Sequence, residues 1–267
     1  MAGAIASHAE GEGSIAYTVG SHVEGKSTKA GGTADNDINS DHGSYAHAEG
    51  DSTIAYSRAA HAEGIGSKAL GRGSHAEGLD TIAEGNYSHA EGGGCWAYSD
   101  YAHAEGCNDG YQPTTASCTG AHAEGMGTVS SGNGSHSEGK GTKALREASH
   151  AEGRYTIVEG DSGHAEGENT SVVDGAWCGH AEGYDTTAAN ECTHAEGYQT
   201  IARGKYSHSE GQESVANGNA SHVEGYGNTT GTNASCAHAE GDENSATGYA
   251  SHVEGKKNIA SGEYQHV

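Results

Sequence analysis

A histidine followed two residues later by a glutamate recurs along the whole sequence. Each copy reads as a small residue, His, then Ala, Val or Ser, then Glu and Gly. Imidazole and carboxylate groups can hydrogen-bond to each other, form ion pairs, or bind metal ions such as Zn, Cu or Ni. The complete copies contain His8, Glu10, His22, Glu24, His47, Glu49, His61, Glu63, His75, Glu77, His89, Glu91, His103, Glu105, His122, Glu124, His136, Glu138, His150, Glu152, His164, Glu166, His180, Glu182, His194, Glu196, His208, Glu210, His222, Glu224, His238, Glu240, His252 and Glu254.

The spacing of these histidines predicts a solenoid. With a partial copy at His266 there are 17 gaps, of which 13 are 14 residues long, and the others are 25, 19, 16 and 16. A short fixed period is the signature of stacked coils. We therefore expect residues 1–267 to form a single continuous solenoid of about 18 coils, with looped insertions near 31–45, 107–120, 168–178 and 226–236. A motif repeated this often predicts architecture, whereas an active site would be one unusual coil, so we expect no enzyme.

Each coil is predicted to contain two short strands. Small residues stand one before, one after and three after the histidine, so they alternate with His and Glu at the period of a strand. Ser or Thr six positions after the histidine and Ala eight after it, as in Thr53 and Ala55, indicate a second strand whose small residues face the same interior. Glycine-rich pairs are expected to form the turns. The fold class is therefore all-β, a parallel β-roll (β-solenoid) of 14-residue coils.

The composition excludes several classes of protein. There are 45 Gly, 1 Pro and no Phe, so a core of large apolar side chains is not available. A net charge of −24 argues against a general binder of nucleic acid or anionic membranes, which would be basic. No stretch approaches the roughly 18–20 apolar residues of a membrane span. We see no signal peptide in residues 1–7, and both ends lie inside a repeat, which suggests a segment of a longer fibre.

The 14-residue coil, with its S-x-A-x-G strand and a T-x-A-x-G-like strand, resembles the head repeat of trimeric autotransporter adhesins of the YadA-like type. The SHAEG spelling is similar to repeats in phage tail-fibre and neck-appendage proteins. This resemblance implies a left-handed β-roll in a homotrimeric fibre, located on the extracellular surface or the virion. The adhesin repeat has apolar residues where this chain has His and Glu, and the family places those side chains at the trimer interface.

The stacked histidines and glutamates, which we call the ladder, can be interpreted in two ways. In register, each carboxylate lies about 4.8 Å from the next and repels it by roughly 1 kcal/mol in water. One hypothesis is a structural ladder of hydrogen bonds between Glu and mostly neutral His of neighbouring coils or chains. The other is a divalent metal (Zn, Cu or Ni) bound by the histidines.

Two cysteines lie beside the ladder at equivalent positions of successive coils. Cys178 and Cys192 are 14 residues apart, so we expect them to stack at about 4.8 Å, within the range of a disulfide. With His180 and His194 they also form a Cys/Cys/His/His set with zinc chemistry. Free thiols, a disulfide and a metal site all remain open.

Two of the insertions carry further candidate residues. Cys107 and Cys118 flank the insertion that holds Pro113, and a disulfide between them would close this loop. The longest insertion has alternating oxygen ligands that resemble a calcium loop, at Asp35, Asp37, Asn39 and Asp41. This segment lacks the Gly and Glu of an EF-hand, and a solvated acidic loop is the alternative interpretation.

These observations favour a structural protein. We expect a fibre shaft of a phage tail fibre or bacterial surface appendage, which provides rigid spacing and attachment to a cell-surface receptor. One alternative is a metal-binding filament that uses the ladder, and another is an adhesin head that binds host matrix. The expected partners are two further copies of the chain and a receptor, with no nucleic acid and no membrane span.

Overall fold

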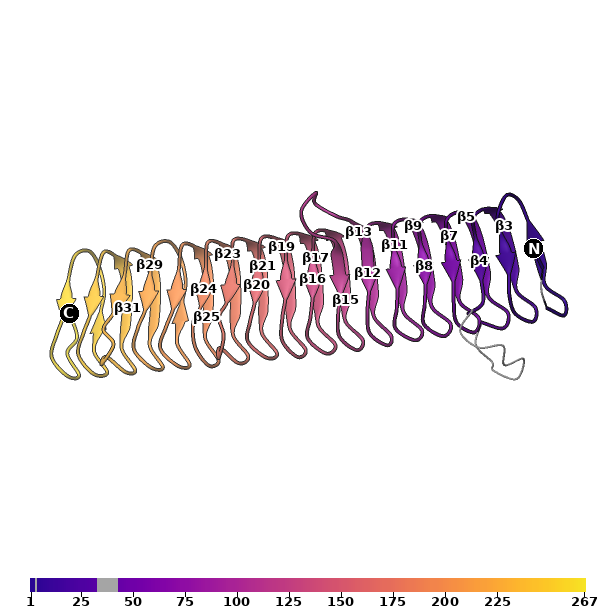
Figure 1. Cartoon of the computed structure of the whole chain (residues 1–267). Helices are drawn as coiled ribbons and strands as arrows, with labels where there is room; N and C mark the ends of the chain where they lie inside the picture. Colours follow the sequence, from indigo (N-terminus) through magenta and orange to yellow (C-terminus); the bar gives the residue numbers. More distant parts are fainter. Residues whose placement is uncertain (3, 33–42) are drawn as a thin grey trace. The chain divides into compact units, whose positions relative to one another are not determined.

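The computed structural model describes residues 1–2, 4–32 and 43–267. The chain divides into two compact units, Met1–Gly134 and Ser135–Val267, which are described separately. The described residues form strands, turns and bends but no helix, so none of them makes a helix that could cross a membrane. In both units short strands stack side by side in successive coils (Figure 1).

The first unit consists of coils that each contain a longer strand and a shorter one. The longer strands, which begin at the ladder histidines, are β1 (His8–Glu10), β3 (His22–Lys26), β5 (His47–Asp51), β7 (His61–Ile65), β9 (His75–Leu79), β11 (His89–Gly93), β13 (His103–Cys107) and β15 (His122–Met126). The shorter strands are β2 (Ile15–Ala16), β4 (Lys29–Ala30), β6 (Ile54–Ala55), β8 (Lys68–Ala69), β10 (Ile82–Ala83), β12 (Cys95–Ala97), β14 (Thr114–Ala116) and β16 (Val129–Ser130).

The second unit repeats this arrangement. Its ladder strands are β17 (His136–Lys140), β19 (His150–Arg154), β21 (His164–Glu168), β23 (His180–Tyr184), β25 (His194–Tyr198), β27 (His208–Ser209), β29 (His222–Tyr226), β31 (His238–Asp242) and β33 (His252–Val253). The shorter strands are β18 (Lys143–Ala144), β20 (Ile157–Val158), β22 (Ser171–Val172), β24 (Thr187–Ala188), β26 (Ile201–Ala202), β28 (Val215–Ala216), β30 (Thr229–Thr230), β32 (Ser245–Ala246) and β34 (Ile259–Ala260).

Within each unit the strands pair in parallel with their equivalents in the next coil. In β19 and β21, for example, His150 pairs with His164 and Glu152 with Glu166. In the shorter strands Ala188 pairs with Ala202. The all-β parallel β-solenoid predicted from the period is therefore confirmed. The in-register pairing means that each side chain lies directly beside the side chain at the same position of the neighbouring coil.

The interior of each coil is filled by small side chains. Ala48 and Ala55 are fully buried from the two strands of one coil, and the largest fully buried side chains are valines such as Val23. A column of buried Ser, Thr and Asn residues, six positions after the ladder histidine, adds hydrogen bonds between coils. In this column Asn228 Nδ2 donates to the Gly241 carbonyl at 2.7 Å. The core is thus narrow because the sequence supplies only small residues at the inward positions.

The glycine three positions after each ladder histidine has a specific steric role. At Gly167 the φ angle is +108°, and an added Cβ would lie 2.0 Å from the carbonyl oxygen of Gly183 in the next coil. Real Cβ atoms do not approach backbone oxygens so closely. The invariant Gly of the motif is therefore required both by its left-handed φ and by the approach of the neighbouring coil.

Glycine occupies some of the left-handed turn positions, such as Gly64 and Gly66, but not all of them. Two positions before the ladder histidine, many residues other than Gly have positive φ, among them Tyr45 (61°), Ala59 (55°) and Cys178 (52°). This conformation costs about 1–2 kcal/mol for such residues. Backbone hydrogen bonds between successive turns compensate, as where Cys178 N donates to the Asp161 carbonyl at 3.0 Å.

The insertions are located between strands and leave the strand pairing intact. Residues 108–113 form a protruding loop between β13 and β14 (Figure 1), where Asp109 Oδ1 accepts from Tyr111 N at 2.8 Å. The two 16-residue repeats have a wider turn before β23 and before β31, each built around a buried alanine, Ala176 or Ala234. The calcium-loop candidates Asp35, Asp37, Asn39 and Asp41 lie outside the described residues.

We predict that Gly167→Ala destabilises the protein by about 3 kcal/mol or more, because it combines backbone strain with a clash against the next coil. Gly175→Ala is the matched control, since Gly175 also has positive φ (+81°) but no heavy atom lies within 4 Å of an added Cβ. The control should lose only about 1–2 kcal/mol. Urea denaturation followed by circular dichroism measures both, and equal losses would contradict the steric role.

Candidate functional site

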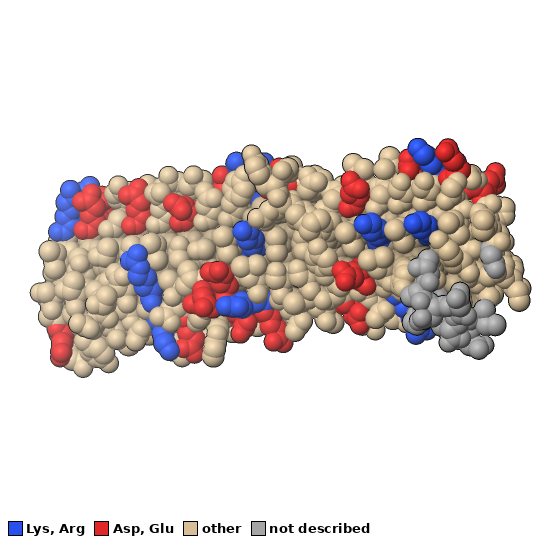
Figure 2. Space-filling view, viewed as in Figure 1, with Lys and Arg blue, Asp and Glu red and all other residues tan. Residues whose placement is uncertain are grey.

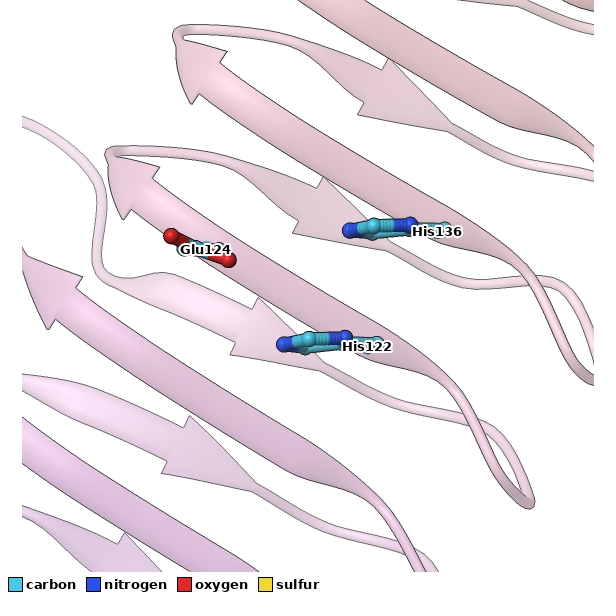
Figure 3. Close-up of side chains that lie close together, drawn as sticks. All are labelled: His122, Glu124 and His136. Atoms are coloured by element: carbon cyan, nitrogen blue, oxygen red, sulfur yellow. The ribbon is translucent and has the colours of Figure 1, made fainter.

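The ladder side chains project from the outer face of the longer strands. Figure 3 shows this for His122 and Glu124, which lie on the same side of β15, while Ala123 between them is fully buried. Successive imidazole rings within each unit are 4.6–4.9 Å apart, and most are nearly parallel, as for His194 and His208. The predicted alternation therefore places all described ladder residues on one continuous face in each unit.

The glutamates contact histidines in two different ways. In β1, in β5 to β13 and in β17 to β25 the carboxylate lies near the imidazole of its own coil, with Nε2–Oε2 distances of 3.6–4.0 Å, as between His61 and Glu63. Near the C-terminal end the carboxylate instead contacts the next coil, where the His252 and Glu240 side chains lie 3.3 Å apart. A ladder carboxylate can therefore contact either of two successive histidines.

Many ladder imidazoles have a buried Nε2 atom with no hydrogen-bond partner. Among the described residues these include His61 and His89 in the first unit and His180, His194 and His208 in the second. Their side chains as a whole are about one third exposed. An unsatisfied buried polar atom costs about 1–3 kcal/mol. The ladder of a single chain is therefore a row of polar groups that lack a full set of partners.

The environment of the ladder lowers the pKa of several imidazoles. For His47, His103, His208 and His238 the pKa is below the ordinary 6.5, first because of desolvation and then because of the neighbouring histidines. Protonating one ring would place a positive charge close to the next. These four histidines are consequently neutral at pH 7.

The stacked carboxylates also perturb one another. The pKa of Glu210 is raised, chiefly by a hydrogen bond with the Glu196 carboxyl, whereas the pKa of Glu224 is lowered, chiefly by a hydrogen bond with Glu240. When two carboxyl groups lie side by side, a second negative charge is unfavourable, which raises the pKa of one member of the pair. A donor or a cation beside the carboxylates would reduce this repulsion.

Basic side chains pair elsewhere on the surface. Arg154 contacts Glu168 at 3.1 Å and Lys205 contacts Glu191 at 2.7 Å, and neither acid belongs to the ladder. On the face that Figure 2 shows, basic and acidic side chains lie in small groups among uncharged residues. The nearest partners that we identify for the ladder carboxylates are therefore the ladder histidines.

No family model and no curated protein is significantly similar to this chain. The ladder is consequently the feature from which a function has to be inferred. It is an extended row of half-exposed imidazoles and carboxylates, which suits binding of a similar row on another chain or of cations.

The cysteines are all free thiols in the structure. Cys178 and Cys192 are exposed and adjacent, and the Cys192 pKa is raised, first by desolvation and then by the Cys178 thiol. Cys107 is exposed at the end of β13, and Cys118 is half-buried against the core. Cys95 is buried in the Ser/Thr column, and burial raises its pKa to about 11.

We predict that stability falls as the pH decreases below about 6.5. A histidine with a lowered folded pKa contributes stability that is fully present above its unfolded pKa and is lost as pH falls through the folded value. Glu210 and Glu224 have pKa shifts in opposite directions, so their contributions to the pH dependence oppose each other. The melting temperature should therefore decline from pH 6.5 to pH 5, and less steeply in the double variant His103→Gln, His208→Gln. A stability maximum in mildly acidic buffer would instead indicate charged, ion-paired histidines.

Proposed function

We propose that this protein is a structural shaft that associates side by side with further copies of itself through the ladder. The single observation that carries the proposal is the repetition of the same half-satisfied His and Glu pair in coil after coil. A partner with the same period would match every rung at once, and another copy of the chain has that period. The resemblance to trimeric β-roll adhesins and phage fibres favours three copies.

Rigidity along the stacking direction supports a mechanical role. Within each unit, hydrogen bonds from the strands and the turns join successive coils of the described residues, as where His150 N donates to the Gly163 carbonyl at 2.9 Å. The buried Asn244 and the half-buried Asn258 extend this network, with Asn258 N donating to Asn244 Oδ1 at 2.8 Å. Bending a unit would stretch many such bonds together, so each unit resists bending.

The chemistry of the ladder supports association. The ladder imidazoles are about one third exposed and the carboxylates about one half exposed, and the carboxylates have unused acceptor positions. A carboxylate of a second chain placed against the exposed part of these imidazoles would give both groups a further hydrogen-bond partner. In this proposal neutral imidazoles donate to carboxylates across the interface, which holds the chains in register.

Surface loops would give such a shaft its contacts with other molecules. The loop at residues 108–113 protrudes from the first unit, and its Tyr111 is 95% exposed. We place the shaft on a virion or a bacterial surface, with receptor contact through loops of this kind. This location follows from the resemblance to phage and adhesin fibres.

Sedimentation of ladder variants tests the proposal. Wild type should sediment as a trimer, and the double variant Glu63→Arg, Glu77→Arg should sediment as a monomer. Each of these carboxylates is about half exposed in the single chain, so the variant removes matched partners without disturbing the coil itself. The new cations would also relieve repulsion within the chain, so a loss of folding is not expected.

Lys68→Glu is the matched control, because Lys68 is exposed on β8, in the opposite sheet of the same coils. This variant should assemble as wild type does. A wild-type monomer would refute the shaft, and unchanged assembly of the Arg variant would show that the ladder is not the interface.

A further inference from the structure

We propose that the ladder at β23, β25 and β27 binds a divalent transition-metal ion between successive coils. The ligands would be His180, Glu182 and His194, or the overlapping set His194, Glu196 and His208. This inference goes beyond the shaft function and does not depend on the chain being a trimer, because all of the ligands come from one chain.

The geometry brings suitable ligand atoms together. In each set one ligand atom from every residue lies within 4.8 Å of the others. His180 Nε2 is 3.7 Å from Glu182 Oε2, and His194 Nε2 is 3.6 Å from Glu196 Oε2. Ligands at roughly 2.0–2.2 Å from one ion lie about 3.2–4.2 Å apart. The His–Glu distances already fit, and a modest rotation of the stacked rings brings the two imidazoles into range.

The nitrogen atoms of these sets are available for coordination. The Nε2 atoms of His180, His194 and His208 are buried and have no hydrogen-bond partner within the described residues. An imidazole nitrogen and a carboxylate oxygen are the ligand types found in zinc, copper and nickel sites. A metal ion would therefore satisfy atoms that the chain alone leaves unsatisfied.

The carboxylate at this ladder position can reach both histidines of a set. The Glu182 and Glu196 carboxylates lie beside the histidines of their own coils. The equivalent Glu240 carboxylate instead contacts His252 of the next coil at 3.3 Å. A ladder glutamate can therefore contact the histidine of its own coil or that of the next coil. A carboxylate that binds an ion between two successive histidines must be able to approach both.

Charge favours occupancy as well. Each set adds a carboxylate to a column in which like charges repeat from coil to coil, and a divalent cation would offset that repulsion. His194 belongs to both sets, so its Nε2 can serve only one ion at a time. We therefore expect one tightly bound ion in this region.

Cobalt titration of the metal-free protein, residues 1–267, tests the inference, since the spectrum of Co²⁺ reports its ligands. The exposed thiols of Cys178 and Cys192 are nearby and could bind the same ion. The titration is therefore done in the Cys178→Ser, Cys192→Ser background. The expected result is a nitrogen and oxygen ligand spectrum that Zn²⁺ abolishes by competition.

In this background His194→Ala should reduce the number of bound ions by one, or weaken the tightest site by about tenfold or more. Glu191→Gln is the matched control, because Glu191 is an acid in the same region that pairs with Lys205 outside the ladder. It should leave binding unchanged. Should His194→Ala fail to fold, the double variant Glu182→Gln, Glu196→Gln, which keeps the side-chain shapes, gives the same readout.

Absence of cobalt binding in the Ser background, or equal binding by wild type and the folded ladder variants, would overturn the metal site. Sedimentation of the same samples separates this outcome from a failure of the shaft. A trimer without cobalt binding refutes only the metal site, and a monomer that binds cobalt refutes only the ladder-mediated assembly.

Discussion

The hydrogen-bonded spacing between successive coils is the constraint on which the rest of the structure depends. Because strands and turns pair in register, every residue lies about 4.8 Å from its equivalent in the next coil. A side chain at a given position of the repeat must therefore pack against the equivalent side chain of the next coil, and the same requirement applies in every coil. This requirement selects small side chains inside and glycine where the backbone of the next coil comes closest, as at Gly167 and Gly183.

The same spacing creates the chemistry of the outer face. Stacked neutral imidazoles tolerate the distance well, as the nearly parallel rings of His194 and His208 show. Stacked carboxylates do not, and the pKa of Glu210 is raised, chiefly through its hydrogen bond with the Glu196 carboxyl. The stacking of the histidine rings is therefore favourable, whereas the stacking of the carboxylates is unfavourable. The need of the carboxylates for hydrogen-bond donors or cations follows from the regular repeat and not from any single residue.

Much of this arrangement can be predicted from the sequence, because the strand period and the 14-residue repeat are visible without coordinates. They predict which residues face inward, such as Ala48 and Ala55, and that His and Glu share the outer face. The choice of histidine by each glutamate could not be predicted. Glu63 and Glu240 have the same position in the repeat, yet one contacts its own coil and the other the next coil.

Two further features also escaped the sequence pattern. The left-handed turn residues are often Tyr, Ala or Cys where glycine would be expected, because hydrogen bonds between stacked turns compensate for local strain, as at Cys178. The handedness of the roll and the number of associated chains remain predictions from the resemblance. They depend on strand twist and on a second chain, neither of which is encoded in the repeat period.

The protruding loop at residues 108–113 shows how such a protein can change its surface without changing its frame. The loop lies between β13 and β14, and both strands keep the register of their neighbours. Substitutions at the tip of this loop are consequently expected to disturb the stacking little, whereas a substitution inside the coil affects the neighbours on both sides. The two parts of the first unit thus differ in their tolerance to change: the stacked frame constrains each residue through its neighbours, and the loop tip is constrained mainly by its own turn.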